Sequence, residues 1–177
     1  MSRQSEKRHA SALRPLAALF SLLTLGACGE SSVESWEIFT VENSHVREGN
    51  RLFPDDPASA LGHYDSAARE LPSEGGVHLN RGLSLLATEQ HDAARSALLL
   101  ASEAGNAEEV RADAHYNLGL SFYGQGDSSA GEDDHEEAQR LFREAADAFR
   151  QALRMRPGHA DSAWNLELAL RRIQEQQ

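Results

Sequence analysis

Three stretches of this chain repeat one pattern of small and large residues at helical spacing. In each, an alanine is followed four positions later by a large apolar residue and three positions after that by another alanine. Steps of four and three keep these residues on one stripe of an α-helix, so the chain is predicted to be all-α. The copies are Ala60-Tyr64-Ala67, Ala94-Leu98-Ala101 and Ala145-Phe149-Ala152.

A glycine precedes each copy, inside another predicted helix. These are Gly49, Gly82 and Gly119. A glycine in the middle of a helix costs about 1 kcal/mol relative to alanine. Because the same cost recurs at the same point of each copy, we expect close helix–helix contact at all three glycines.

Helix-start and helix-stop signals divide the chain into seven predicted helices and no strand. Capping residues are expected at Asp56, at Asn106 and at Asp134. Pro72 and Pro157-Gly158 are expected to end helices, and Gly105 to follow one. The first helix has an alternative start at Ser44, with Asn43 as its cap. The predicted helices span about 33–53, 57–71, 75–87, 90–104, 107–124, 135–156 and 160–175.

The combined pattern resembles the tetratricopeptide repeat (TPR), a pair of helices in about 34 residues with a small residue at the crossing and a final proline. The resemblance implies an all-α TPR superhelix of three helix pairs and a capping helix. In the last helix Glu167 stands where the repeats have glycine. A glutamate does not fit a close crossing, and a polar cap is what a terminal repeat requires. The expected repeats cover about 33–72, 75–105 and 107–157, and the cap covers 160–175.

The third repeat is longer than the others. Pro157 lies 38 residues after Gly119, where a repeat of this kind has about 24. The difference, 38 − 24, leaves 14 residues, which we assign to 128–141. Ser128 to Glu132 is predicted to be a flexible loop, and the remainder is predicted to lengthen the following helix.

Residues 1–27 are typical of a bacterial lipoprotein signal peptide. Four basic residues precede an apolar stretch from Pro15 to Ala27, which is too short to span a bilayer as a helix. The following Leu25–Cys28 run resembles a lipobox, which implies lipidation of Cys28 and cleavage before it. Residues 28–32 are then expected to tether a domain at 33–177 to the periplasmic face of a membrane. The alternative is a plain secretory leader with a chance cysteine.

The chain without its leader is strongly acidic. The leader holds four of the 17 Lys and Arg residues and one of the 28 Asp and Glu residues, so the remainder carries 13 − 27 = −14. This balance argues against binding to nucleic acid or to anionic lipid, which both need clustered positive charge. With the single cysteine lipidated, no thiol remains for a disulfide, a nucleophile or a metal site.

Beyond the generic repeat, four stretches resemble the TPR proteins of Bat (aerotolerance) operons: Val46–Asn50, Leu79–Gly82, Ala114–Gly119 and Ala163–Leu170. The similarity covers roughly residues 39–173. It implies partnership with membrane-bound von Willebrand factor A (VWA) domain proteins that are encoded beside a MoxR-type AAA+ ATPase.

Two features depart from what we expect of that family: the insertion at 128–141 and the lipid anchor. Gly29 directly after Cys28 resembles lipoproteins that are sent to the outer membrane. An assembly lipoprotein of an outer-membrane or pilus machine is therefore the alternative function, and the choice of membrane stays open.

A TPR array has no catalytic pocket, and its partners usually bind the concave face lined by the first helix of each pair. We therefore expect a non-enzymatic protein-binding adaptor, with no cofactor, metal or small-molecule substrate. The residues expected to line this groove are Arg47, Asn50, Asn80, Leu83, Tyr116, Asn117, Leu120, Tyr123, Trp164, Asn165, Leu168 and Arg171.

Asn80, Asn117 and Asn165 occupy one equivalent position and form a ladder. A primary amide offers both donor and acceptor, so a row of amides can hold an extended peptide backbone. The alternative is that these asparagines bridge or cap within the array. Arg47 and Arg171 stand at opposite ends of the groove, where we expect solvated charge and no clamp.

Two groups of residues are of types that bind metals, but each group is expected to have a structural role. His45, His78 and His115 share one repeat position, where packing is expected. Helices pack about 8–10 Å apart, so equivalent residues of successive pairs are too distant to share one ion. The acidic run Glu132–Glu137 lacks the glycine turn of a calcium loop and is expected to serve a helix start. A cation site in this run is the competing interpretation.

Overall fold

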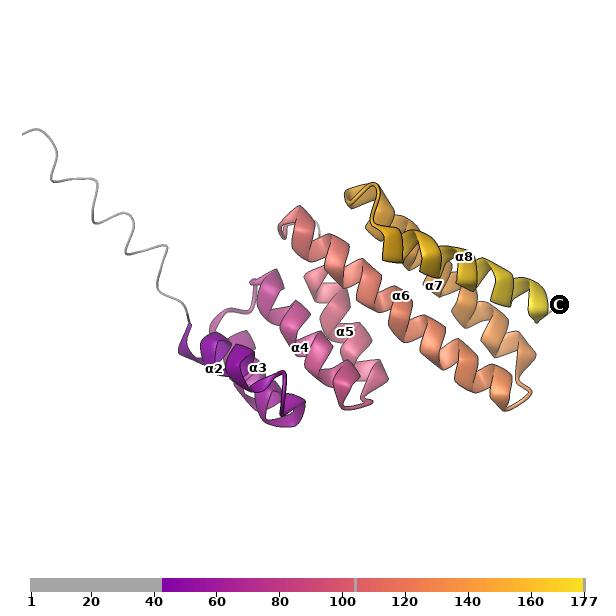
Figure 1. Cartoon of the computed structure of the whole chain (residues 1–177). Helices are drawn as coiled ribbons and strands as arrows, with labels where there is room; N and C mark the ends of the chain where they lie inside the picture. The colour runs from indigo at the N-terminus through magenta and orange to yellow at the C-terminus, as the bar shows by residue number, and fades with distance from the viewer. Residues whose placement is uncertain (1–42, 104, 177) are drawn as a thin grey trace, which may run out of the picture. The chain divides into compact units, whose positions relative to one another are not determined.

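The computed structural model describes residues 43–103 and 105–176, and all regular structure within them is helical (Figure 1). The predicted leader, Cys28 and residues 33–42 of the first predicted helix lie outside the described residues. The helices are α2 (Ser44–Leu52), α3 (Pro57–Glu70), α4 (Gly75–Ala87), α5 (His91–Ala101), α6 (Glu108–Gly131), α7 (His135–Met155) and α8 (Ala160–Glu175).

Each helix packs against the next one along the chain, which gives the antiparallel pairs α2–α3, α4–α5 and α6–α7 and places α8 against α7. Helices two apart also touch, since α4 contacts α6 and α6 contacts α8. In Figure 1, α4, α6 and α8 lie towards the viewer, with α5 and α7 behind them. One layer therefore contains the first helices of successive pairs.

The three mid-helix glycines lie at close helix crossings, as predicted. A Cβ atom on any of them would lie 2.5–2.7 Å from a side chain of the next helix, much closer than two carbon atoms can approach. The side chain met is in each case the large member of the alanine-flanked stripe, and it is almost completely buried. The pairs are Gly49–Tyr64, Gly82–Leu98 and Gly119–Phe149.

The insertion lengthens two helices, and the predicted loop at 128–132 is wrong. Helix α6 continues to Gly131, and α7 begins at His135. A fourth crossing explains the difference, because a Cβ atom on Gly126 would lie 2.8 Å from the buried Phe142 ring. Gly126 is seven residues after Gly119, and Phe142 is seven residues before Phe149. Two antiparallel helices stay in register when each gains about two turns, so the 14 residues extend the hairpin as seven on each side.

Three helices begin at the predicted caps. The side chains of Asn43, Asp56 and Asp134 each accept a hydrogen bond from a backbone N–H in the first turn of the helix that follows. These bonds satisfy donors that a helix start leaves unpaired. Helix α2 therefore begins at Ser44, the alternative start expected from the sequence.

Two expectations for the α5–α6 connection are wrong. The residue before α6 is Ala107, and Asn106 donates its side-chain N–H to the carbonyls of Leu100 and Ala101, at 2.9 and 3.1 Å. The amide thus satisfies the end of α5, whose last carbonyls have no partner within the helix. Gly105 lies several residues beyond the end of α5. Only Gly158, after α7, has a positive φ among the described glycines.

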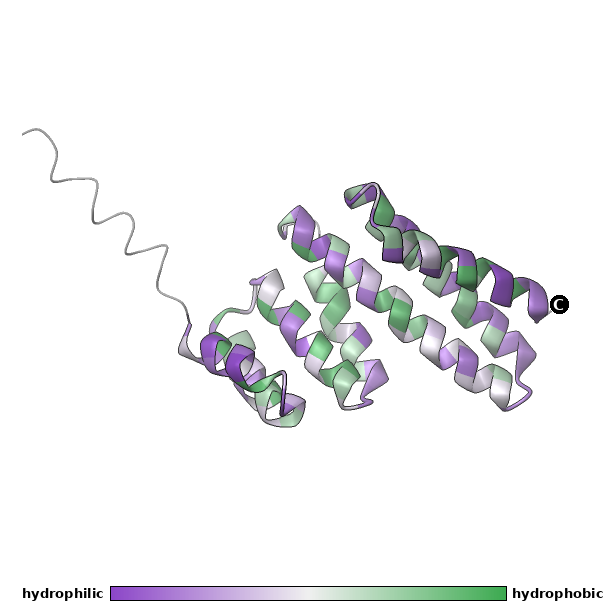
Figure 2. Cartoon of the chain, in the orientation of Figure 1, coloured by the Kyte–Doolittle hydropathy of each residue, from purple (hydrophilic) through white to green (hydrophobic). Residues whose placement is uncertain are grey.

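Figure 2, in the orientation of Figure 1, shows both hydrophobic and hydrophilic segments along the helices. The buried side chains come from the contacting faces of neighbouring helices, with Tyr64, Leu98, Phe142 and Phe149 the largest that are almost fully buried. Within the described residues, no helix has the length and apolar character needed to cross a membrane.

Candidate protein-binding face

Helices α4, α6 and α8 present large apolar residues at matching positions in one layer of the molecule. On α4 and α6 these residues recur at steps of four and three, and on α8 at one step of four, which keeps them on one side of each helix. We call them the repeat face. Its members are Leu79, Leu83 and Leu86 on α4, Tyr116, Leu120 and Tyr123 on α6, and Trp164 and Leu168 on α8.

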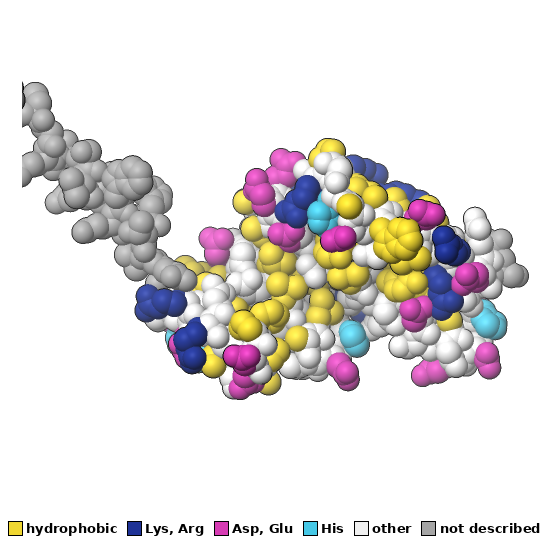
Figure 3. All heavy atoms as spheres, viewed as in Figure 1, with side chains coloured by type: hydrophobic (Ala, Val, Ile, Leu, Met, Phe, Trp, Pro, Cys, Tyr) yellow, Lys and Arg dark blue, Asp and Glu magenta, His cyan; other side chains and the backbone are white. Residues whose placement is uncertain are grey.

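Some side chains of the repeat face pack against the buried core, and others are exposed to solvent. Leu79 packs against the core cluster around Leu98, and Tyr116 and Tyr123 pack against the cluster around Phe149. By contrast, Leu120 is 38% exposed and Trp164 is 61% exposed. Figure 3 shows hydrophobic side chains gathered over α4, α6 and α8, with many of the charged side chains towards the edges. Large aromatic side chains on a rigid support are typical of protein-binding surfaces.

The first asparagines of the expected groove are linked to one another. Asn80 donates its Nδ2–H to Oδ1 of Asn50 at 3.1 Å, and the hydroxyl of Tyr64 donates to the same oxygen at 2.8 Å. Asn50 therefore joins α2, α3 and α4. This bridging role is the alternative expected for the asparagine ladder.

The other two asparagines also use one donor within the array. Asn117 donates to the carbonyl of Asp113 at 2.8 Å, and Asn165 donates to the hydroxyl of Tyr116 at 3.4 Å. Within residues 43–103 and 105–176, no donor reaches Oδ1 of Asn80, Asn117 or Asn165. Asn80 and Asn165 thus link neighbouring helices, Asn117 is bonded within its own helix, and each of the three keeps an amide oxygen that no described donor occupies.

The charged residues at the ends of the expected groove do not converge. Arg47 is exposed on α2. Arg171 lies 3.6 Å from Glu167, and both side chains are more than half exposed. An exposed pair of this kind contributes little to stability. The middle of the expected groove therefore carries apolar side chains and amides, and its two ends carry separate charges.

The three histidines of the shared repeat position have different surroundings. The Nε2 atom of buried His78 lies 2.8 Å from the carbonyl oxygen of Pro72, to which it can donate. Burial, and after it the positive charge of Arg111, lowers the pKa of His115. His45 contacts His63 of the next helix. Nowhere in the described part of the chain do three His, Cys, Asp or Glu side chains converge as a metal site.

A cavity of about 420 Å³ lies between the start of α5 and the extended α6–α7 hairpin. Its two cationic side chains are already paired, since Arg95 contacts Asp92 and Gln125 while Arg140 contacts Glu137 at 2.6 Å. This cavity therefore lacks free positive charge for an anionic ligand.

No protein-family model matches this chain, and no curated protein matches it. The function of the chain is therefore inferred from the geometry of the repeat face and from the sequence patterns.

The sequence did not point to the contacts that lock α8 onto the extended hairpin. Arg172 of α8 lies 2.5 Å from Asp127 of α6 and 5.1 Å from the centroid of the Phe142 ring of α7. Tyr123 meets the same ring edge-on at 5.3 Å between centroids. The sequence carried one indication of the longer hairpin, because Gly126 lies seven residues after Gly119 and Phe142 lies seven residues before Phe149.

Proposed function

We propose that this protein is a non-enzymatic adaptor that binds a protein partner on the repeat face. The observation that supports the proposal is a surface of matching apolar positions on three adjacent helices, with Leu120 and Trp164 exposed. Aromatic anchors surrounded by apolar area supply most of the affinity at protein interfaces. The free amide oxygens beside them can accept backbone N–H groups from an extended segment.

The fold that we propose is a TPR superhelix of three helix pairs with α8 as its cap. The close glycine crossings and the contacts of α4 with α6 and of α6 with α8 support this assignment. In α8, Glu167 is exposed at the position where the pairs have glycine. A superhelix of this kind curves its first helices around a concave groove, which brings the repeat face onto the inner surface.

We further propose that Cys28 anchors the domain to the periplasmic face of a membrane. The lipobox-like run before Cys28 supports lipidation. Stable anchoring requires more than one acyl chain, since a single chain binds membranes only weakly. The part of the chain after the leader is acidic, so it adds no electrostatic attraction to anionic lipid.

Replacing the lipid acceptor tests the anchor. We expect Cys28→Ser to move the protein from the membrane fraction to the soluble periplasmic fraction, because no other part of the proposed architecture holds it to lipid. Ser31→Ala is the matched control and is expected to stay in the membrane fraction. Membrane recovery of Cys28→Ser equal to that of the natural chain would contradict the lipid anchor.

The resemblance to Bat-operon proteins places this adaptor, in our proposal, in a Bat/MoxR-type stress-tolerance system with a VWA-domain protein as its partner. The alternative is an assembly lipoprotein for an outer-membrane or pilus machine, which Gly29 after the lipidated cysteine favours. Separation of inner and outer membranes distinguishes the two. Recovery with the inner membrane supports the Bat system, and recovery with the outer membrane supports the assembly role.

Site-specific photo-crosslinking in cells tests the repeat face and can identify the partner in the same experiment. A photoreactive residue replaces Leu120 on the repeat face in one variant and Leu99 on α5 in the other. Leu120 is 38% exposed and Leu99 is 57% exposed, so the control position is at least as accessible. We expect one protein, identified by mass spectrometry, to crosslink from Leu120 only. The same yield from Leu99 would show that the partner does not bind the repeat face.

A further inference from the structure

An aspartate lies one helical turn before the first aromatic residue of the repeat face on α6, and an arginine neutralises it. Asp113 precedes Tyr116 by three residues. Its Oδ1 accepts a hydrogen bond from Nη1 of Arg156 at 2.8 Å. Arg156 comes directly after α7, so the second helix of the pair supplies the cation. A guanidinium group therefore fits beside a carboxylate at this repeat position.

The equivalent aspartate of α8 lacks such a cation. Asp161 lies six residues before Glu167, as Asp113 lies six residues before Gly119. It is exposed in the first turn of α8. Within residues 43–103 and 105–176, no Arg or His side chain pairs with its carboxylate. No helix follows α8 in this part of the chain, so none places an arginine there.

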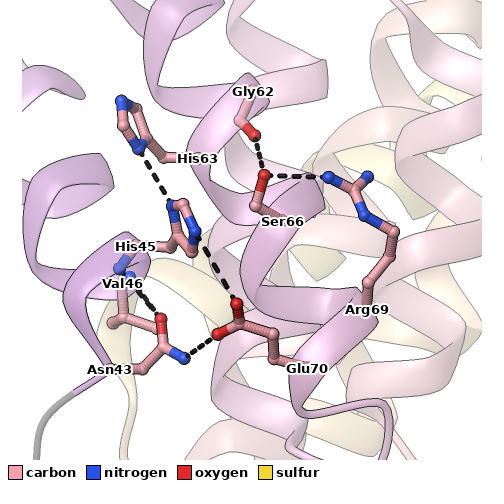
Figure 4. A network of polar contacts seen from close by, with 8 residues as sticks. All are labelled: Asn43, His45, Val46, Gly62, His63, Ser66, Arg69 and Glu70. Carbon is pink, nitrogen blue, oxygen red and sulfur yellow. Dashed lines mark hydrogen bonds and ion pairs between the residues drawn. The ribbon is translucent and has the colours of Figure 1, made fainter.

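Carboxylates between helices are paired at other points of the array. Asp65 of α3 accepts a hydrogen bond from Nε of Arg81 of α4 at 2.6 Å. Figure 4 shows Glu70 near the end of α3 facing Asn43 at the start of α2, and the amide donates to the carboxylate at 2.7 Å. Asp161 differs because no described neighbour of α8 offers it a donor of this kind.

The unpaired carboxylate stands beside the most exposed aromatic residue of the repeat face. Asp161 and Trp164 are three residues apart on one helix, which makes their side chains neighbours. Trp164 is 61% exposed, and tryptophan is the best aromatic partner for a cation. The array already contains this combination, since Arg172 lies 2.5 Å from Asp127 and 5.1 Å from the centroid of the Phe142 ring. A carboxylate beside an aromatic ring thus suits a guanidinium group.

We propose that Asp161 and Trp164 bind a basic side chain, preferably arginine, of the protein segment that occupies the repeat face. An arginine can stack on the indole ring and pair with the carboxylate at the same time. The charge after the leader, 13 − 27 = −14, attracts a basic segment over a longer range. The inference rests on the proposed function and specifies its partner: a segment with large apolar residues for α4 and α6 and a basic residue for α8.

Selection of random peptides displayed on phage, with the purified full-length chain as target, tests the chemistry of the partner. We expect the selected peptides to combine large apolar residues with arginine or lysine at a fixed spacing. On Asp161→Asn the apolar residues should persist and the basic residue should be lost. Apolar peptides without a basic residue on the natural chain would overturn this inference and leave the proposed function standing. Recovery of no common sequence would overturn both.

The affinity of one selected peptide then separates a local contact from general charge attraction. Fluorescence anisotropy is measured for this peptide and for a version with its basic residue replaced by glutamine. We expect Asp161→Asn to weaken binding of the first peptide about 5–10-fold, because a charge pair and a cation–π contact are both disturbed. The same substitution should leave binding of the glutamine peptide unchanged.

Glu136→Gln is the matched control for the loss of charge. Glu136 is exposed in the first turn of α7, in the other layer, so its replacement removes one negative charge at the same kind of helix position. We expect it to bind the basic peptide like the natural chain, and the melting temperatures of both variants check that the fold is retained. Equal weakening by Asp161→Asn and Glu136→Gln, or equal weakening of both peptides by Asp161→Asn, would overturn the proposal.

Discussion

Gly119→Val is expected to lower the free energy of unfolding by about 3 kcal/mol, the upper end of what overpacking a core usually costs. A Cβ atom at this position would lie 2.5 Å from the ring of Phe149, which is completely buried. The ring has no free space to move into, and the branched side chain adds two further carbons. The helices α6 and α7 would have to separate at the crossing. Urea unfolding followed by helical circular dichroism measures the change.

Gly124→Val is the matched control on the same helix. Nothing lies within 4 Å of a Cβ atom at Gly124, which is exposed. The substitution there changes only helix propensity. Valine stabilises a helix relative to glycine by roughly a few tenths of a kcal/mol. We expect Gly124→Val to unfold at the same urea concentration as the natural chain or slightly above it. Equal losses at the two sites would mean that the α6–α7 crossing is not close.

Trp164→Ala is expected to weaken binding of the crosslinked partner by about 30-fold or more, which corresponds to about 2 kcal/mol and is typical of an aromatic anchor. The side chain is 61% exposed in the free chain. Its removal therefore leaves the core of the repeats intact while deleting the largest apolar contact that the repeat face can offer. Calorimetric titration of the purified partner into each variant measures the change in affinity.

The matched control for this prediction is Leu99→Ala. Leu99 is a large apolar residue that is 57% exposed on α5, in the other layer. We expect its affinity for the partner to equal that of the natural chain, and we expect both variants to keep their melting temperature. Unchanged affinity in Trp164→Ala would remove α8 from the binding surface and limit the repeat face to α4 and α6.

The α-helical class and most helix boundaries could be predicted because they depend on local signals. Asp56 followed by Pro57 defines the start of α3, and its side chain does accept the backbone N–H of Ser59. The alanine-flanked stripes predicted which side of each helix packs, and Phe149 and Leu98 are completely buried. Caps and stripes act over a few residues of chain, which is why they are visible before the fold is known.

The candidate site was predictable only in part. The repeat pattern predicted that Leu120 and Trp164 line the groove, and both are exposed in the structure. The hydrogen bond between Asn80 and Asn50 was not predictable, because it joins residues 30 apart through the angle between two helices. The pair formed by His45 and His63 depends in the same way on how α2 lies against α3.

The sequence by itself determined that this chain folds into helices and where six of the seven described helices begin, to within a residue. It also determined that Gly49, Gly82 and Gly119 lie at close helix contacts. Tertiary structure alone decided the path of the insertion. A local pattern with polar residues at Ser128 and Ser129 favours a loop, but packing of Phe142 over Gly126 keeps α6 helical to Gly131. The buried contact outweighs the local preference, and a contact between two helices has no counterpart in either segment alone.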